Sequence, residues 1–210
     1  MSISVLIVDD HEVVRLGLLN LLNDAEIEVV GQANSAPTAL QFAAETQPQI
    51  VLLDVRLPDM DGLEVIDHLR EVSPQSRVIV LSAYDNPTYV ARAITLGAQD
   101  YVLKGSGRAE ILAAIKAVAS GDRSRQSALL RRIEAVLQST SEAPVQGASL
   151  TTRESQVLRH LALGLSNKDI GRSLSISIET VKEHVQNVLR KMGVVDRTQA
   201  AVEAVKQGLV

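Results

Sequence analysis

Residues 50–62 read I-V-L-L-D-V-R-L-P-D-M-D-G, and this stretch decides the fold. The apolar residues 50–53 do not alternate with polar ones, so they predict a strand buried on both faces, as in the middle of a parallel sheet. Asp54 follows at the carboxyl end, where Pro58 and Gly62 mark a loop. Ligands of open α/β sheets bind at that edge. Asp54 is therefore the first candidate site residue.

Three further apolar runs also end in polar side chains. Residues 5–8 lead into Asp9 and Asp10, residues 78–81 into Ser82, and residues 101–103 into Lys104. Three carboxylates at about 4 to 5 Å from one another repel by roughly 1 to 4 kcal/mol per pair, depending on the effective dielectric. The cluster therefore calls for a cation, and an all-oxygen site of this kind suits Mg²⁺.

These residues resemble the receiver domain of bacterial two-component response regulators. The matching pieces are D-D-H at 9–11, D-V-R-L-P-D-M-D-G at 54–62, Ser82 with Ala83, and Y-V-L-K at 101–104, in family order and spacing. Gly105 departs from the family, because many receivers have proline there. The resemblance implies that Asp54 accepts a phosphoryl group from a sensor histidine kinase, and that the protein is no enzyme beyond removing its own phosphoryl group.

The resemblance also implies a role for each residue of the cluster. Mg²⁺ would be bound by Asp10 directly, by Asp9 through water, by Asp54, and by the backbone carbonyl of Arg56. Ser82 and Lys104 would hold the phosphoryl oxygens, and Tyr101 would change rotamer as the switch. We interpret Tyr84 and Tyr89 as residues that cap the sheet edge.

Composition and length bound the remaining possibilities. The chain has 210 residues, enough for two domains, and 46% of them are hydrophobic. It has no cysteine, which excludes disulfides and thiolate zinc sites. The four histidines are scattered, and we interpret each as a surface or structural residue. Without a long apolar run or a signal peptide, we expect a cytoplasmic protein with no membrane partner.

The first half alternates strand and helix patterns, which predicts an α/β doubly wound, flavodoxin-like receiver domain over residues 1–120. The absence of G-x-G-x-x-G after the first strand disfavours dinucleotide binding. Predicted strands cover 5–8, 27–33, 50–53, 78–81 and 100–103. Predicted helices cover 12–23, 36–45, 62–71, 87–96 and 108–119.

Residues 121–147 are rich in Ser, Pro, Gly and Gln, which is typical of a linker. Within it, the apolar spacing of residues 128–137 predicts a short helix. Residues 148–210 then form the second, all-α domain, with predicted helices at 152–163, 167–174, 178–192 and 198–207. Thr151 with Glu154 has the pattern of a capping box, and the tight turn 175–177 joins the second and third helices as in a helix-turn-helix.

The motifs L-T-x-R-E-x-x-V-L from Leu150, G-L-S-N-K-D-I from Gly164 and T-V-K-E-H-V-x-N from Thr180 resemble the LuxR-type DNA-binding domain. With the receiver, this places the chain in the NarL/FixJ class of response regulators. The third helix would enter the major groove of double-stranded DNA. Its candidate DNA-binding residues are Thr180, Lys182, Glu183, Gln186, Asn187, Arg190 and Lys191. On the fourth helix, Ala201, Val202 and Val205 would pair two domains, giving a homodimer when phosphorylated or DNA-bound.

Charge differs between the two predicted domains in a way that fits this assignment. Residues 1–120 carry 8 Lys and Arg against 16 Asp and Glu, whereas residues 148–210 carry 9 against 6. An acidic half suits a cation and a basic domain suits a polyanion. The absence of aromatic residues after Tyr101 disfavours single-stranded nucleic acid, where stacking matters.

Two other readings stay open on the residues alone. A haloacid-dehalogenase-like phosphatase also uses a strand-end aspartate and Mg²⁺, although its D-x-D-x-T/V motif is not matched by Asp54-Val55-Arg56. Alternatively, the receiver would serve only for dimerisation, without phosphate. The complete set of acids, hydroxyl and lysine argues against that alternative.

Overall fold

The computed structural model describes residues 2–140 and 149–210. Its residues cluster into two compact units: Met1–Asn86 with Leu96–Leu130, and Pro87–Thr95 with Arg131–Val210. Within the described part of the chain, none of the helices combines the length and apolar character needed to span a bilayer.

The first unit contains a five-stranded parallel sheet in the order β2-β1-β3-β4-β5. Its strands are β1 (Ile3–Val8), β2 (Ile27–Ala33), β3 (Ile50–Asp54), β4 (Arg77–Ser82) and β5 (Asp100–Leu103). The helices that connect the strands are α1 (Glu12–Leu21), α2 (Ala36–Thr46), η1 (Gly62–Glu64), α3 (Val65–Val72), α4 (Pro87–Leu96) and α5 (Arg108–Ser120). The predicted α/β doubly wound receiver fold is confirmed.

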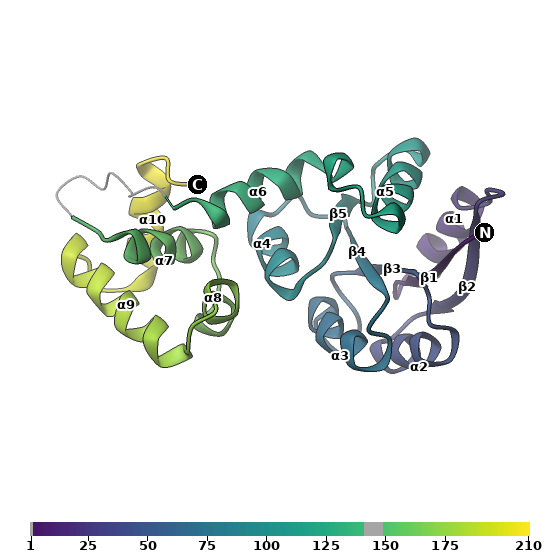
Figure 1. The fold of residues 1–210 in the computed structure, drawn as a ribbon, viewed down its shortest axis with the longest axis horizontal. Coiled ribbons are helices and arrows are strands. Elements are labelled where there is room, and N and C mark those ends of the chain that lie inside the picture. Colours follow the sequence, from purple (N-terminus) through teal and green to yellow (C-terminus); the bar gives the residue numbers. More distant parts are fainter. Residues whose placement is uncertain (1, 141–148) are drawn as a thin grey trace. The chain divides into compact units, whose positions relative to one another are not determined.

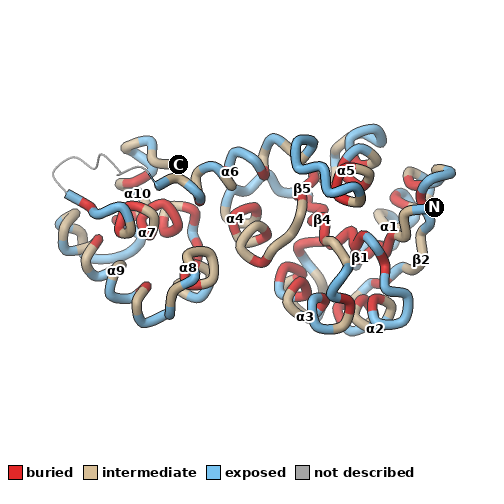
Figure 2. The backbone as a smooth tube through the Cα atoms, in the orientation of Figure 1, coloured by how far each residue is buried: buried red, intermediate tan, exposed pale blue. Residues whose placement is uncertain are grey.

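The strands are buried because helices cover both faces of the sheet (Figures 1 and 2). On one face, apolar residues of β1, β3 and β4 pack with α1 and α5, with Ile7, Leu52 and Ile115 among the buried residues. On the other face lie α2 and α3 (Figure 1). Every residue of β3 is buried, as its unbroken apolar run predicts.

The predicted helix over 62–71 differs from the structure in its first turn. Residues Gly62–Glu64 form a 3₁₀ turn, and α3 begins at Val65. The Asp61 side chain accepts the Leu63 N–H, which favours this tighter turn.

The second unit is all-helical and consists mainly of α7 (Thr152–Ala162), α8 (Asn167–Leu174), α9 (Ile178–Met192) and α10 (Arg197–Lys206). The predicted capping box forms at Thr151 with Glu154, and a second capping box forms at Ser166 with Asp169. Its core joins Leu158 of α7, Val188 of α9 and Ala204 of α10. The predicted all-α second domain is confirmed.

The segment between the two domains contains η2 (Arg123–Arg125) and α6 (Ala128–Gln138). The predicted short helix over 128–137 therefore forms. Residues 141–147 of the predicted linker lie outside the described residues.

Candidate functional site

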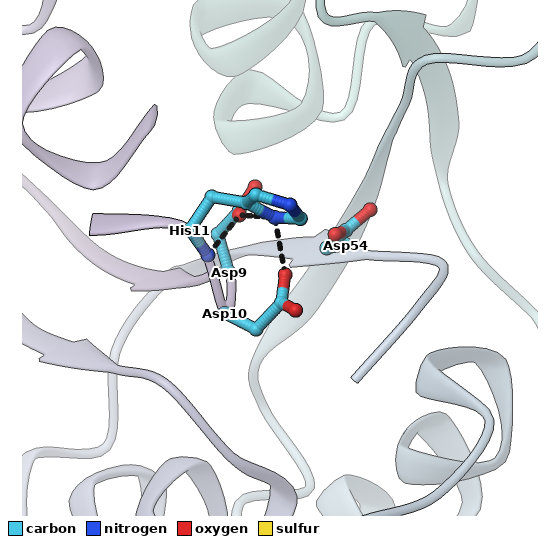
Figure 3. A group of neighbouring side chains, drawn as sticks. All are labelled: Asp9, Asp10, His11 and Asp54. Carbon is cyan, nitrogen blue, oxygen red and sulfur yellow. Dashed lines mark hydrogen bonds and ion pairs between the residues drawn. The ribbon is translucent and has the colours of Figure 1, made fainter. Parts of the chain in front are cut away.

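The polar strand ends meet at one edge of the sheet. Asp54 ends β3 and Ser82 ends β4, while Asp9 and Lys104 directly follow β1 and β5. Because all pairings are parallel, these carboxyl ends share an edge. Figure 3 shows Asp9, Asp10 and His11 on one side of the site and Asp54 facing them.

Lys104 lies between two buried carboxylates. Its Nζ is 2.6 Å from Asp9 Oδ2 and 2.9 Å from Asp54 Oδ2. Asp9 is 1% exposed and Asp54 is 5% exposed. The predicted grouping of two acids with the lysine is therefore present in the geometry.

Burial dominates the electrostatics of the site. Burial raises the pKa of Asp54, and the hydrogen bond and charge of Lys104 offset only part of that rise. For Lys104, burial lowers the pKa, but the hydrogen bonds and charges of Asp9 and Asp54 outweigh it and the pKa is raised. The lysine therefore stays charged, and a further cation at this edge would stabilise the ionised form of Asp54.

His11 belongs to the same cluster, which the sequence analysis did not predict. Its Nδ1 lies 2.5 Å from Asp10 Oδ1 and 3.4 Å from Asp9 Oδ1 (Figure 3). One ligand atom from each of Asp9, Asp10, His11 and Asp54 lies within 4.8 Å of all the others. The signal in the sequence was its place directly after the two aspartates.

The loop after β3 closes tightly on Asp54. The Gly62 N–H donates to the Val55 carbonyl at 2.9 Å, and Arg56 forms a β-bridge with Asp61. A Cβ at Gly62 would lie 2.0 Å from the Asp54 carbonyl oxygen, so only glycine fits there. The glycine thus fixes the loop that carries Arg56 beside Asp54.

Ser82 and Tyr101 are linked through Tyr84. The Tyr84 N–H donates to Ser82 Oγ at 3.0 Å, and the Tyr101 hydroxyl donates to the Tyr84 carbonyl at 2.8 Å. Tyr101 is buried, whereas the Tyr84 ring is partly exposed with the Arg56 guanidinium 4.7 Å from its centroid. A movement of Ser82 would therefore disturb the contact that holds Tyr101 inward.

A second candidate site is the outer face of α9. Among its predicted DNA-binding residues, Lys182, Glu183, Gln186 and Arg190 are exposed, and Thr180 and Asn187 are half-buried. Lys182 pairs with Glu179 at 3.5 Å, and Arg190 Nη2 donates to Asn187 Oδ1 at 2.8 Å.

Lys191 has a structural partner that the sequence analysis missed. Its Nζ donates to Glu154 Oε2 at 2.6 Å, and Glu154 also accepts the Thr151 N–H in the capping box of α7. Burial raises the pKa of Glu154, but these hydrogen bonds outweigh it and the pKa is lowered. Lys191 therefore joins α9 to α7, and its predicted contact with DNA stays a prediction.

The predicted dimer residues lie on α10. Val202 is 49% exposed and Val205 is 52% exposed, while Ala201 is half-buried. The two valines lie three residues apart and thus on one face of the helix.

Comparison with known proteins identifies both parts. Residues 5–116 match the response regulator receiver domain, and residues 148–204 match the bacterial regulatory proteins of the luxR family. The chain belongs to the NarL/LuxR family of response regulators. The chain is 38% identical to the transcriptional regulatory protein LiaR of Bacillus subtilis over 209 residues, which cover 99% of both chains.

Solved structures agree with the fold of this response regulator. The crystal structure of the response regulator ChrA, from a heme-sensing two-component system, covers 100% of this chain and 99% of its own with 29% identity and a TM-score of 0.54. A structure of two RcsB dimers bound to two parallel DNAs covers 98% of both chains with 23% identity and a TM-score of 0.59. The latter likeness supports the fold alone.

Proposed function

We propose that this response regulator is a transcription regulator controlled by transfer of a phosphoryl group from a sensor histidine kinase to Asp54. The observation that carries the proposal is the buried Asp54 carboxylate beside Lys104, Asp9 and Asp10 at the carboxyl edge of a parallel sheet. A carboxylate nucleophile needs cationic neighbours to receive a phosphoryl group, and this edge is built to supply them.

The donor set fits Mg²⁺. Asp9, Asp10 and Asp54 offer carboxylate oxygens that converge within 4.8 Å together with the His11 nitrogen, and hard oxygen ligands suit Mg²⁺. The backbone carbonyl of Arg56, fixed by the loop that Gly62 closes, would add a further oxygen. When bound, the ion would supply charge neutralisation for the transferred group.

The chemical step follows from the residues at the edge. An Asp54 carboxylate oxygen attacks the phosphorus of the kinase phosphohistidine, so an O–P bond forms as the N–P bond breaks and the imidazole leaves. Lys104 Nζ, which touches Asp54 Oδ2, neutralises the equatorial phosphoryl oxygens. The Ser82 hydroxyl then donates a hydrogen bond to the same group, and Tyr101 changes position through its hydrogen bond to Tyr84.

DNA binding is proposed for α9. Its exposed face combines cationic and amide side chains that suit phosphate contact and base readout in the major groove of double-stranded DNA. Val202 and Val205 on α10 would pair two such domains, so that a homodimer contacts two half-sites. Because bacterial DNA lies in the cytoplasm, this function places the protein there.

The phosphoacceptor is tested with beryllofluoride, a phosphoryl mimic, followed by ¹⁹F NMR on the full chain. Wild-type protein should take up beryllofluoride only with Mg²⁺, and Asp54→Asn should lose this uptake. Asp59→Asn is the matched control, because Asp59 lies in the same loop and accepts the Ala36 N–H, which an asparagine oxygen also does. Metal-dependent uptake by Asp54→Asn would place the nucleophile elsewhere.

A further inference from the structure

Arg15 contacts the backbone of both aspartates that follow β1. Its Nη1 donates to the Asp9 carbonyl at 2.8 Å and to the Asp10 carbonyl at 3.2 Å. Arg15 is partly buried and lies one turn into α1. A single guanidinium nitrogen therefore donates to the backbone carbonyls of two consecutive residues, and the side chains of these residues are the carboxylates proposed to bind the metal.

This contact restricts how the two carboxylates can point. The carbonyls of Asp9 and Asp10 belong to the two peptide units that flank the Asp10 Cα, and because each unit is planar, holding both restricts φ and ψ of Asp10 and so the direction of its Cα–Cβ bond. Two further hydrogen bonds hold Asp9. Its N–H donates to the Ala33 carbonyl at 3.1 Å, and its Oδ1 accepts the His11 N–H at 2.9 Å. Asp10 is more exposed, with 32% of its side chain accessible, and besides its contact with His11 Nδ1 at 2.5 Å its direction depends on the backbone that Arg15 holds.

We propose that Arg15 is a positioning residue for the metal site: it orients the carboxylates of Asp9 and Asp10 toward the bound cation. The inference rests on the proposed function, because it assigns Arg15 a part in the same Mg²⁺ site. Arg15 itself carries no metal-ligating atom and acts through the two aspartates.

Charge and positioning predict opposite effects when Arg15 is removed. A guanidinium near the site repels Mg²⁺, so if charge alone mattered, its loss would tighten Mg²⁺ binding. If Arg15 orients the ligands, its loss weakens binding, since partners of metal ligands typically contribute about 10- to 100-fold in affinity. The direction of the change therefore separates the two roles.

The experiment titrates MgCl₂ into full-length protein and follows amide chemical shifts by NMR, which also reports that the fold is intact. Arg15→Met keeps the side-chain stem and removes the donors and the charge. Arg108→Met is the matched control: Arg108 donates to the Leu21 carbonyl at 2.9 Å and the Asn23 carbonyl at 3.2 Å, at the other end of α1. Arg15→Lys keeps the charge but replaces the rigid guanidinium with an ammonium on a flexible stem that ends one bond earlier than Nη1, so it cannot hold both carbonyls in the same way.

We expect Arg15→Met to bind Mg²⁺ about 10-fold more weakly than wild type, Arg15→Lys to lie between them, and Arg108→Met to match wild type. Equal or tighter binding by folded Arg15→Met would overturn the inference. Should Arg15→Met not fold, wild-type affinity in Arg15→Lys would overturn it instead. If wild-type protein itself fails to bind Mg²⁺, the proposed function is wrong, which is a distinguishable result.

Discussion

His160 shows how burial sets the chemistry of a single side chain. It is fully buried on α7, with Nδ1 2.7 Å from the Gln156 carbonyl and Nε2 2.8 Å from Ser173 Oγ. A carbonyl only accepts, so Nδ1 carries the proton and the neutral ring accepts the Ser173 hydroxyl at Nε2. Burial lowers the pKa of His160 below its usual 6.5, and the charges of Arg159 and Arg153 lower it further.

A pH dependence of stability follows for the second unit. Because the pKa of His160 is lower in the folded state, the unfolded chain binds a proton first as pH falls through 6.5. The neutral His160 therefore contributes fully to the free energy of unfolding above pH 6.5, and this contribution is lost as the pH falls below 6.5. We expect the protection factors of α7 amides, which are exchange rates corrected for the intrinsic pH dependence of exchange, to fall between pH 7 and 5 in wild type, and to fall less in His160→Gln.

His184→Gln is the control, because it replaces another histidine of the same unit that is only half-buried and lies on α9, not on α7. Protection factors in α7 that fall equally with pH in wild type and His160→Gln would contradict the role of His160.

Some site residues have a recognisable sequence pattern and others do not, and this decides which of them the sequence predicts. Asp9, Asp54, Ser82 and Lys104 were predictable because each follows an apolar run, and parallel strands bring such ends together. Arg15 contacts backbone carbonyls, which every residue type provides, so nothing in the residue pattern marks its partners. Long-range side-chain partners require the fold.

Among the secondary-structure elements, β5 has a charged side chain with long-range contacts at each of its ends. Lys104 follows its carboxyl end, whereas Asp100 begins the strand and accepts the Ser127 N–H at 3.0 Å, just before α6. Gln126 Nε2 also donates to the Gln99 carbonyl at 2.8 Å. Burial raises the pKa of Asp100, and its hydrogen bonds from Ser127 offset part of that rise. The segment before α6 is therefore attached to β5 by hydrogen bonds between residues 27 positions apart in the sequence. The composition of the linker did not predict these hydrogen bonds.

Removing this attachment should loosen residues 121–127. Asp100→Ala loses hydrogen bonds to a charged acceptor, each contributing about 1.5 to 3 kcal/mol. We expect trypsin to cleave faster after the exposed Arg123 and Arg125 than in wild type, measured by mass spectrometry of the fragments. Glu45→Ala, which removes an exposed carboxylate on α2, should leave the rate unchanged. Equal cleavage of Asp100→Ala and wild type would show that Asp100 does not hold the segment.

The recognition role of α9 can be separated from general charge effects. Lys182→Ala should weaken the free energy of DNA binding by about 1 to 3 kcal/mol if Lys182 reads a base, or reduce the salt slope by about 1 if it contacts a phosphate. Lys206→Ala is matched to it, because Lys206 is also an exposed lysine with a glutamate three residues earlier. Wild-type affinity and salt dependence in Lys182→Ala would refute the proposed role of this face.

In the whole molecule, an acidic receiver domain is followed along the chain by a basic LuxR-type domain. Residues 1–120 hold 16 Asp and Glu against 8 Lys and Arg, and residues 148–210 hold 9 Lys and Arg against 6 Asp and Glu. Phosphorylation of Asp54 would place about −2 charge beside Lys104, where the ionised carboxylate carries −1. We expect this local change to alter DNA binding by the other domain.

The most direct test measures the affinity of full-length protein for one double-stranded DNA fragment, selected from genomic DNA by binding, at fixed salt. The comparison is between wild type and Asp54→Asn, each with Mg²⁺ and with or without beryllofluoride. We predict that beryllofluoride tightens wild-type binding by about 5- to 150-fold, the usual range of coupling between sites, and leaves Asp54→Asn unchanged. Unchanged wild-type affinity, or an equal response in Asp54→Asn, would show that phosphorylation of Asp54 does not control DNA binding.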